Sequence, residues 1–391
     1  MRKLTLQQKH YMLVRAVKLQ RRALAWRNWR RLRNIGLASE RVVDVYKDGS
    51  KFSVVAQRSI PMPESFCLDT NTGDTLAFLD KMWDEVLDKA TEASNRRRSL
   101  QARRKSSSKI TRFYDLATIR QFSPSAALVL ASLFQRAKHI SGSKLYTINE
   151  EKWDADVAFV LRALGFHEML EMRPLRDWEF DSSKFKILKF QTGREAVGEH
   201  PGKLQESLLE LLSPAQQESL LAVEPYGGML EAILNSHSWA YPADHEFHHK
   251  VLPNWWITGA FDTTSNEVTV CAFDQGVSIP VSLPRWTHWG EFELRGRKIA
   301  EKLKLSRSID HYSNDGLAIQ LALKIARSKT GLPQHGKGLL TMLEVAQRAK
   351  HGRLRILSRN GEFVWETGQK PQSFTHKHPL RGTLVEWQLQ L

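Results

Sequence analysis

Residues 51–170 alternate between two hydrophobic periods, and this alternation limits the fold more than any other feature of the chain. Three segments have the short, β-branched and aromatic character of strands, at 51–60, 109–118 and 143–149. Three others repeat apolar side chains at helical spacing, at 75–93, 123–140 and 154–170. Because strands that alternate with helices fold into layers of helix against sheet, we predict an α/β domain here.

The positive charge of the chain is concentrated in two short segments. The 391 residues contain 58 Lys and Arg against 42 Asp and Glu, a net charge of +16. Eleven basic residues fall in residues 1–34 and seven in residues 95–109, and neither segment contains an acid. The rest of the chain is therefore nearly neutral. Such basic blocks suit the phosphates of DNA or RNA, anionic lipid, or the acidic face of a protein partner.

The first basic segment is predicted to be helical, and we take residues 1–40 as a basic helical arm. Apolar side chains recur in it at helical spacing, at Leu13, Ala16, Val17 and Leu24. Trp26 and Trp29 lie among arginines, a combination that stacks on bases or anchors at a membrane interface. The alternative is a solvated helix that docks on its own protein by the apolar stripe.

The second basic segment, residues 95–109, has serine-rich flanks and no apolar period, which is typical of a loop or linker. Two cysteines, Cys67 and Cys271, do not make a disulfide framework, so we expect a reducing cytoplasmic compartment. The longest apolar run, residues 126–134, is too short to cross a bilayer, and no transmembrane segment is predicted.

Residues 41–200 combine this strand–helix order with a serine-bearing turn that precedes a helix and with Gly165-Phe166 near the next helix end. Over part of its length, this domain resembles a STAS domain, the fold of anti-sigma-factor antagonists. In that family the serine of this turn can be phosphorylated. Here the turn reads FSPSAA and lacks the family's acid and glycine. We therefore expect Ser123 or Ser125 to cap the helix, with Pro124 in its first turn.

Residues 201–391 contain four short motifs in a fixed order. They are Glu231-x-x-x-Asn235, Asp274-x-Gly276-x-Ser278-Ile279-Pro280, His335-Gly336-Lys337-Gly338-Leu339 and Gly382-Thr383. With the helices and strands around them, these motifs resemble the ATP-binding fold of the GHKL group, which includes gyrases and histidine kinases. The resemblance covers this whole segment. It implies a Bergerat-type α+β sandwich that binds ATP and Mg²⁺.

The first motif resembles the N-box of that group. Residues four apart share one face of a helix, so a single helix offers Glu231 and Asn235 to one site. An amide oxygen suits Mg²⁺, and a carboxylate beside it can orient the attacking water as a general base. The resemblance thus implies that Glu231 is catalytic and that Asn235 binds the metal and the nucleotide. The competing interpretation of this pair is a solvated glutamate and a capping asparagine.

The second motif resembles the G1 box and implies an adenine site. Asp274, at the end of a buried strand, would accept a hydrogen bond from the adenine amino group. Gly276 lets the backbone approach the base, and Ile279 completes the motif. Ser278 stands where the group usually has a second glycine. An ordinary β-turn is the competing interpretation.

The other two motifs resemble the G2 box and the Gly-Thr of the last motif. Glycines in the G2 box, here Gly336 and Gly338, free backbone N–H groups to face phosphate oxygens, and the helix start at Leu339 favours anions. Lys337 would add a positive charge near the terminal phosphates. The Thr383 hydroxyl is expected to support the contact between the aspartate and adenine.

A histidine-rich segment is a weaker candidate for a functional site. His245, His248 and His249 have the spacing of helical metal ligands, with two acids beside them. Because no cysteine pair and no third fixed ligand accompanies them, the sequence does not favour a metal site. Trp255 and Trp256 are expected to fill the core beneath the ATP-binding loop.

The sequence thus predicts a cytoplasmic ATPase whose Mg²⁺-dependent turnover drives a conformational switch or a change of homodimer state. One alternative is a serine protein kinase of the anti-sigma type that acts on a STAS partner. The other is a nucleic-acid-binding regulator in which ATP gates DNA or RNA contacts through residues 1–34 and 95–109.

Overall fold

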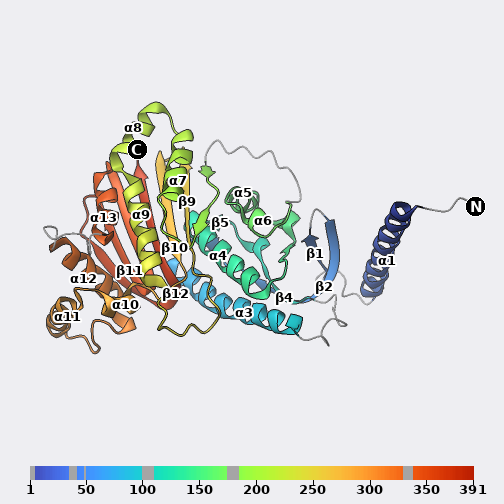
Figure 1. The fold of residues 1–391 in the computed structure, drawn as a ribbon, viewed down its shortest axis with the longest axis horizontal. Coiled ribbons are helices and arrows are strands. Elements are labelled where there is room, and N and C mark those ends of the chain that lie inside the picture. The colour runs from blue at the N-terminus through green and yellow to red at the C-terminus, as the bar shows by residue number, and fades with distance from the viewer. Residues whose placement is uncertain (1–4, 35–41, 48–49, 99–109, 174–184, 329–337) are drawn as a thin grey trace, which may run out of the picture.

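The computed structural model describes residues 5–34, 42–47, 50–98, 110–173, 185–328 and 338–391 (Figure 1). Within these ranges the chain is a mixture of helices and strands, with an antiparallel sheet at its C-terminal end. None of the described helices combines the length and the apolar character that crossing a bilayer requires.

The first helix, α1 (Leu6–Asn34), coincides with the helix predicted for the basic arm. Figure 1 draws it at the N-terminal end of the molecule, far from the large sheet. Its described side chains face solvent, including the apolar Leu13 and Leu24 of the predicted stripe. The apolar stripe is therefore exposed, which does not match the alternative of a helix docked on its own protein.

The N-terminal α/β part contains a four-stranded sheet in the order β4-β2-β1-β6. Its strands are β1 (Val42–Lys47), β2 (Ser50–Pro61), β4 (Ile110–Asp115) and β6 (Thr147–Ile148). β2 and β4 run parallel, whereas β1 is antiparallel to both of its neighbours. A second, two-stranded sheet joins β3 (Ser65–Phe66) to β5 (Gln121–Phe122). The strands predicted at 51–60 and 109–118 are confirmed, although β4 ends at Asp115. The strand predicted at 143–149 is wrong in length, because only β6 forms there, and β1 was not predicted.

The helices of this part follow the predicted segments, except that the segment 154–170 divides into two helices at Gly165. They are α3 (Thr72–Arg98), α4 (Pro124–Ser141), α5 (Ala155–Ala163) and α6 (Phe166–Met169). Ser123 is the N-cap of α4 and accepts a hydrogen bond from the Ala126 N–H at 3.3 Å, so the predicted cap is confirmed. The loop predicted for 95–109 is wrong at its start, because α3 continues to Arg98; residues 99–109 lie outside the described residues.

The C-terminal sheet is antiparallel, with the order β11-β12-β10-β9-β7, and β8 pairs with β9 as well. Its strands are β7 (Phe185–Ile187), β8 (Gln191–Gly193), β9 (Trp255–Asp262), β10 (Glu267–Asp274), β11 (His351–Glu366) and β12 (Gln372–Gln390). β11 is one long strand whose register against β12 shifts around Arg359. β9 was not predicted.

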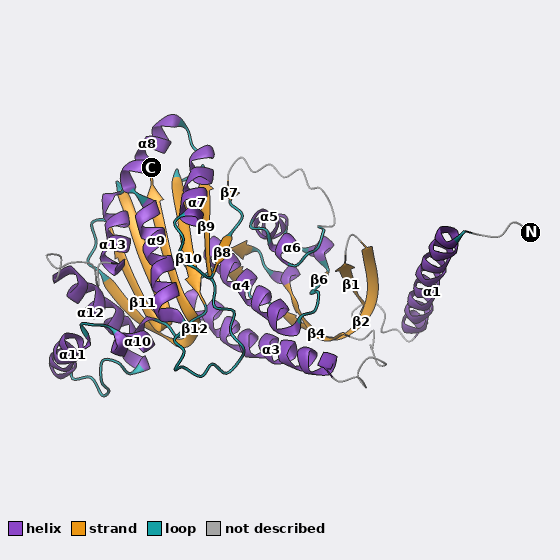
Figure 2. Ribbon diagram, viewed as in Figure 1, coloured by secondary structure: helices purple, strands orange, loops and turns teal. Residues whose placement is uncertain are grey.

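Helices cover both faces of this sheet, as Figure 2 shows. One face carries α7 (Glu199–Glu210), α8 (Pro214–Val223), α9 (Pro225–Asn235) and α13 (Gly338–Arg348). α12 (Asp315–Ser328) packs on the same face. α10 (Ile279–Ser282) and α11 (Trp289–Leu303) pack against α12 in a smaller apolar cluster. The opposite face packs against α3 and α4. Successive strand residues therefore enter different cores, and Trp255 and Trp256 illustrate this alternation.

Candidate functional site

A cavity of about 480 Å³ opens between the C-terminal sheet and the helices α9, α10 and α13. Seven of the residues predicted from the motifs line it: Glu231, Asn235, Asp274, Ile279, Gly338, Leu339 and Thr383. Gly276 lies directly behind its floor, against Ala240. Gly336 and Lys337, also predicted for this site, lie outside the described residues. The four motifs therefore contribute to one cavity although Glu231 and Thr383 are 152 residues apart in the chain.

One wall of the cavity is the C-terminal half of α9. Glu231 and Asn235 lie one turn apart on the face that lines the cavity, as their spacing predicted. The helix then widens into a π-helical turn, Ser236–Ala240, which adds the side chain of Trp239 to the wall. Such π segments occur often at functional sites. Glu231 is half-buried, and this burial raises the pKa of its carboxyl group above the usual value.

Gly338, the first residue of α13, lies directly opposite this pair. A Cβ atom built on Gly338 would lie 2.7 Å from Oε2 of Glu231 and 3.1 Å from Nδ2 of Asn235. The first backbone N–H groups of an α-helix have no partner within the helix, and the helix dipole favours an anion there. This end of the cavity therefore combines a carboxylate, an amide and a helix N-terminus.

The floor of the cavity is formed by the ends of two paired strands. Asp274 is the last residue of β10, and Thr383 of β12 lies opposite it. The Asp274 carboxylate accepts a hydrogen bond from the Gly276 N–H at 2.8 Å and makes a second one with the Thr383 backbone. Burial is the larger effect and raises the pKa of Asp274 to about 7. A buried acceptor with spare lone pairs thus faces the cavity.

Glycines allow this close approach of backbone segments. A Cβ atom on Gly276 would lie 2.3 Å from the carbonyl oxygen of Ala240, at the end of the π-helical turn. Gly382 has φ +137°, and a Cβ atom there would lie 1.8 Å from the carbonyl oxygen of Asp274. A side chain at either position would push these backbone segments apart. This is a physical reason for the glycine in both motifs.

The Thr383 hydroxyl contacts a serine of the neighbouring strand. Its Oγ1 lies 2.8 Å from Oγ of Ser358, and Ser358 Oγ also accepts a hydrogen bond from the Ile279 N–H at 2.8 Å. Thr383 therefore reaches Asp274 by its backbone, while its hydroxyl joins β12 to β11 and to the start of α10. No pattern in the sequence marked Ser358, because its partners come from two distant segments.

Ser278 has a backbone conformation that favours glycine, which is the usual residue at this position of the G1 box. Its φ of +83° and ψ of 159° lie in a region that is almost confined to glycine, and other residues adopt it at a cost on the order of 1–3 kcal/mol. Its side chain is buried at the cavity, and among the described residues Oγ has no hydrogen-bond partner. A buried hydroxyl without a partner is a place where a polar ligand atom or a water molecule would bind.

The apolar part of the lining was largely missed by the motifs. It includes Trp239, Trp255, Ile257, Ala272, Leu283, Trp286, Met342 and Val385. Ala272 and Val385 lie two positions from Asp274 and Thr383, so strand alternation would have found them. Leu283 begins a 3₁₀ turn of three residues after α10, and Trp286 caps it; a turn this short has no period to recognise. A few polar groups among apolar walls are typical of a small-molecule site.

The two serines considered as phosphorylation sites lie elsewhere. Ser123 is 8% exposed and Ser125 is fully buried, and their hydroxyl oxygens lie 3.2 Å apart at the start of α4. The histidine segment around His248 is irregular rather than helical. Comparison with protein-family models, with curated proteins and with solved structures found no match for this chain.

Proposed function

We propose that this chain binds ATP with Mg²⁺ in the cavity beside α9 and hydrolyses it, as a nucleotide-driven conformational switch. One observation carries the proposal: seven residues chosen from four sequence motifs line the same cavity. Chance placement would scatter them over the surface. The proposal also draws on the resemblance to the GHKL group, which connects these motifs with ATP.

The floor suits the recognition of an adenine base. Asp274 offers a carboxylate acceptor to an exocyclic amino group, and a hydrogen bond to a charged acceptor is stronger than one between neutral groups. The walls near it are apolar, with Ile279, Leu283 and Met342 available to cover a flat ring. Ser278 Oγ supplies one further polar contact. These features favour a purine with an amino group as the ligand.

The opposite end suits a polyphosphate and its metal ion. The N-terminus of α13 faces this end, and phosphate groups bind readily at helix N-termini. The amide oxygen of Asn235 would hold Mg²⁺, which would neutralise phosphate charge. Glu231 would accept the proton of the attacking water, a role for which its raised pKa is suited.

The N-terminal helices contact the segment that forms the adenine end. Arg136 of α4 is 4% exposed, and its Nη1 donates to Oε1 of Gln275 at 3.4 Å. Its Nε and Nη2 donate to the carbonyl oxygens of Lys250 and His249, each at 3.0 Å. Gln275 follows Asp274 directly. A shift of this strand end on nucleotide binding would therefore reach α4, which supports a switch rather than a simple hydrolase.

The test is an ATP titration of the full chain and of Asp274→Asn by isothermal calorimetry. Asp262→Asn, at the half-buried end of β9 and outside the cavity, is the matched control. We expect binding by the wild type and the control, and its loss in Asp274→Asn. Absence of binding by the wild type, or equal affinity in Asp274→Asn, would contradict the proposal.

The products distinguish hydrolysis from the kinase alternative. Hydrolysis releases free phosphate, whereas a kinase leaves acid-stable phosphoserine on the chain or on an added STAS partner. For phosphorylation of the chain itself, the burial of Ser123 and Ser125 favours free phosphate, since Ser125 is fully buried and Ser123 nearly so. Labelled phosphoserine as the main product would establish the kinase instead.

A second candidate, a regulator that binds nucleic acid, is favoured by the exposure of α1. Trp26 is 54% exposed, and the described basic side chains of the same helix are also exposed. Exposed aromatic and cationic groups on one helix can stack on bases and neutralise phosphates. This candidate is compatible with ATP binding, because the two surfaces are separate.

A further inference from the structure

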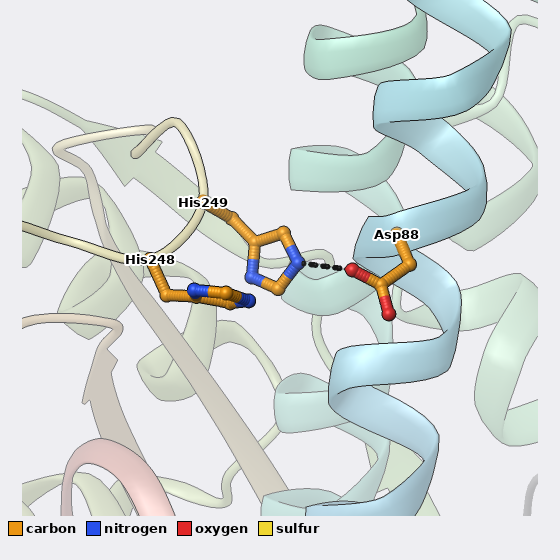
Figure 3. Close-up of side chains that lie close together, drawn as sticks. All are labelled: Asp88, His248 and His249. Carbon is orange, nitrogen blue, oxygen red and sulfur yellow. Dashed lines mark hydrogen bonds and ion pairs between the residues drawn. The ribbon is translucent and has the colours of Figure 1, made fainter.

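Two histidines and an aspartate from distant segments meet on the surface, outside the cavity (Figure 3). His248 and His249 belong to the irregular segment before β9, and Asp88 projects from α3, 161 residues from His249. Nε2 of His249 lies 2.9 Å from Oδ1 of Asp88. One ligand atom from each of the three side chains lies within 4.8 Å of the other two. Sequence spacing alone offered no third ligand here, and α3 supplies it.

Hydrogen bonds from a buried arginine fix the backbone beside the two histidines. Arg136 binds the carbonyl oxygens of His249 and Lys250, as described above. The His249 side chain is 7% exposed, so its ring has little freedom. The rings of His248 and His249 have centroids 4.5 Å apart and planes at 83°. The position of His249 is therefore fixed by buried contacts, as expected for an anchoring ligand.

The other two ligands face solvent. The side chain of Asp88 is 61% exposed, and His248 is exposed as well. Exposed side chains rotate at little cost, so these two can close on an ion that His249 holds. Around a tetrahedral ion with bonds of about 2.1 Å, ligand atoms lie about 3.4 Å apart. The present separations require a movement of little more than 1 Å, on the order of a side-chain rotation.

We propose that Asp88, His248 and His249 form a binding site for a divalent transition metal, with Zn²⁺ as the best-suited ion. Two imidazole nitrogens and one carboxylate oxygen are typical zinc donors, and three protein ligands leave one position for water. Mg²⁺ prefers an all-oxygen environment, so this site is distinct from the metal of the proposed nucleotide site. Metal binding replaces the His249–Asp88 hydrogen bond, and the ring nitrogen that faces Asp88 must be deprotonated to bind.

An ion at this site would cross-link α3 to the segment before β9. A ligand that binds only the folded chain raises its stability, so the metal should raise the melting temperature. The proposal does not depend on ATP, because none of the three residues lines the cavity. Failure of nucleotide binding would leave it unaffected.

The experiment uses the full chain, stripped of metal with a chelator and then titrated with Zn²⁺ by calorimetry. Titration with Co²⁺, followed by its visible absorption, reports the ligand geometry. His248→Gln and Asp88→Asn remove ligands with exposed side chains and leave the hydrogen bonds of Arg136 to this backbone in place. Each should weaken Zn²⁺ binding by at least about tenfold. The matched control is His245→Gln, because His245 lies in the same segment and packs on Phe247 outside the cluster.

We expect one tight Zn²⁺ site in the wild type and in His245→Gln, with a rise in melting temperature that both ligand variants lose. An excess of Mg²⁺ should not displace the Zn²⁺. The proposal is overturned if micromolar Zn²⁺ does not bind. It is equally overturned if Zn²⁺ affinity is the same in His248→Gln, Asp88→Asn and the wild type.

Discussion

Gly338 at the start of α13 lies against the carboxylate of Glu231 on α9, so close that a Cβ atom would lie 2.7 Å from Oε2. Gly338→Ala should therefore displace the carboxylate rather than unfold the chain, because Oε2 ends a flexible side chain. Misplacing a catalytic group by about 1 Å can cost up to a hundredfold in rate. We expect a loss of ATP turnover of this order, measured as phosphate release, with an unchanged melting temperature.

The control for this substitution is Gly290→Ala in the first turn of α11. A Cβ atom there would have no neighbour within 4 Å. It should leave both turnover and stability unchanged. Normal turnover in Gly338→Ala would show that Glu231 does not take part in the reaction.

Substitutions of Glu231 and Asn235 should affect hydrolysis and metal binding separately. Glu231→Gln keeps the shape of the side chain but removes the base, so ATP should still bind while turnover slows by about a hundredfold or more. Asn235→Ala should instead lose the part of ATP affinity that depends on Mg²⁺. Calorimetry with and without Mg²⁺, beside a phosphate-release assay, distinguishes the two effects. Exposed Glu218 of α8 provides the control Glu218→Gln; wild-type turnover in both test variants would make the α9 pair structural.

Asp274 should make ligand affinity depend on pH. Burial raises its pKa to about 7, and the ionised form is the stronger acceptor for an amino group. The ionised fraction, and with it the affinity, should rise by about tenfold from pH 6 to pH 8. Adenosine is the suitable probe, because it has no phosphate that titrates in this range. An affinity for adenosine that does not change between these pH values would contradict the assigned contact.

The Asp274 carboxyl group should also make the stability of the ligand-free chain depend on pH. Its folded pKa lies above the ordinary value of 3.8, so the folded state binds the proton more tightly than the unfolded state. The stabilisation is complete below about pH 4 and is lost as the pH rises through about 7. Asp274→Asn should remove this dependence, so that denaturant unfolding at pH 8 shows the variant to be no less stable than the wild type. A large loss of stability at pH 8 would indicate that the charged form is needed for the fold.

The sequence predicted the local parts of the site better than the contacts between them. Spacing placed Glu231 and Asn235 on one helical face, because helix periodicity is a local property. Strand patterning placed Asp274 at a strand end for the same reason. The pairing of Thr383 with Ser358 joins two strands, and no local pattern specifies it.

The elements that the sequence missed are short or depend on distant partners. β7 has three residues, too few for a period of two to be recognised, and it is specified by its pairing with β9. The contact of Asp88 with His249 depends on how α3 packs against the large sheet. The positive φ of Ser278 is imposed by the turn in which it lies, since serine has no preference for that conformation.

The final prediction concerns α1 and residues 1–34, which contain eleven basic residues and no acid. If this segment binds DNA or RNA, each phosphate contact releases counterions, and affinity falls with a log–log salt slope of about −0.9 per phosphate on duplex DNA. Affinity should vary little with base sequence, since arginine and tryptophan can hold the backbone and stack without reading base edges. Fluorescence anisotropy between 50 and 200 mM salt, roughly the range over which such contacts weaken, measures the slope.

Deletion of residues 1–34 should abolish this binding and leave ATP turnover intact, because every described residue of the cavity lies beyond residue 230. Anionic lipid would also bind in a salt-sensitive way, so anionic vesicles must be titrated beside DNA and RNA. Binding to vesicles alone would identify a membrane-surface helix. Binding that survives the deletion would transfer the role to residues 95–109, the other basic segment. If the full chain binds none of the three at low salt, the exposed stripe of α1 is a docking surface for a protein, and the nucleic-acid hypothesis is wrong.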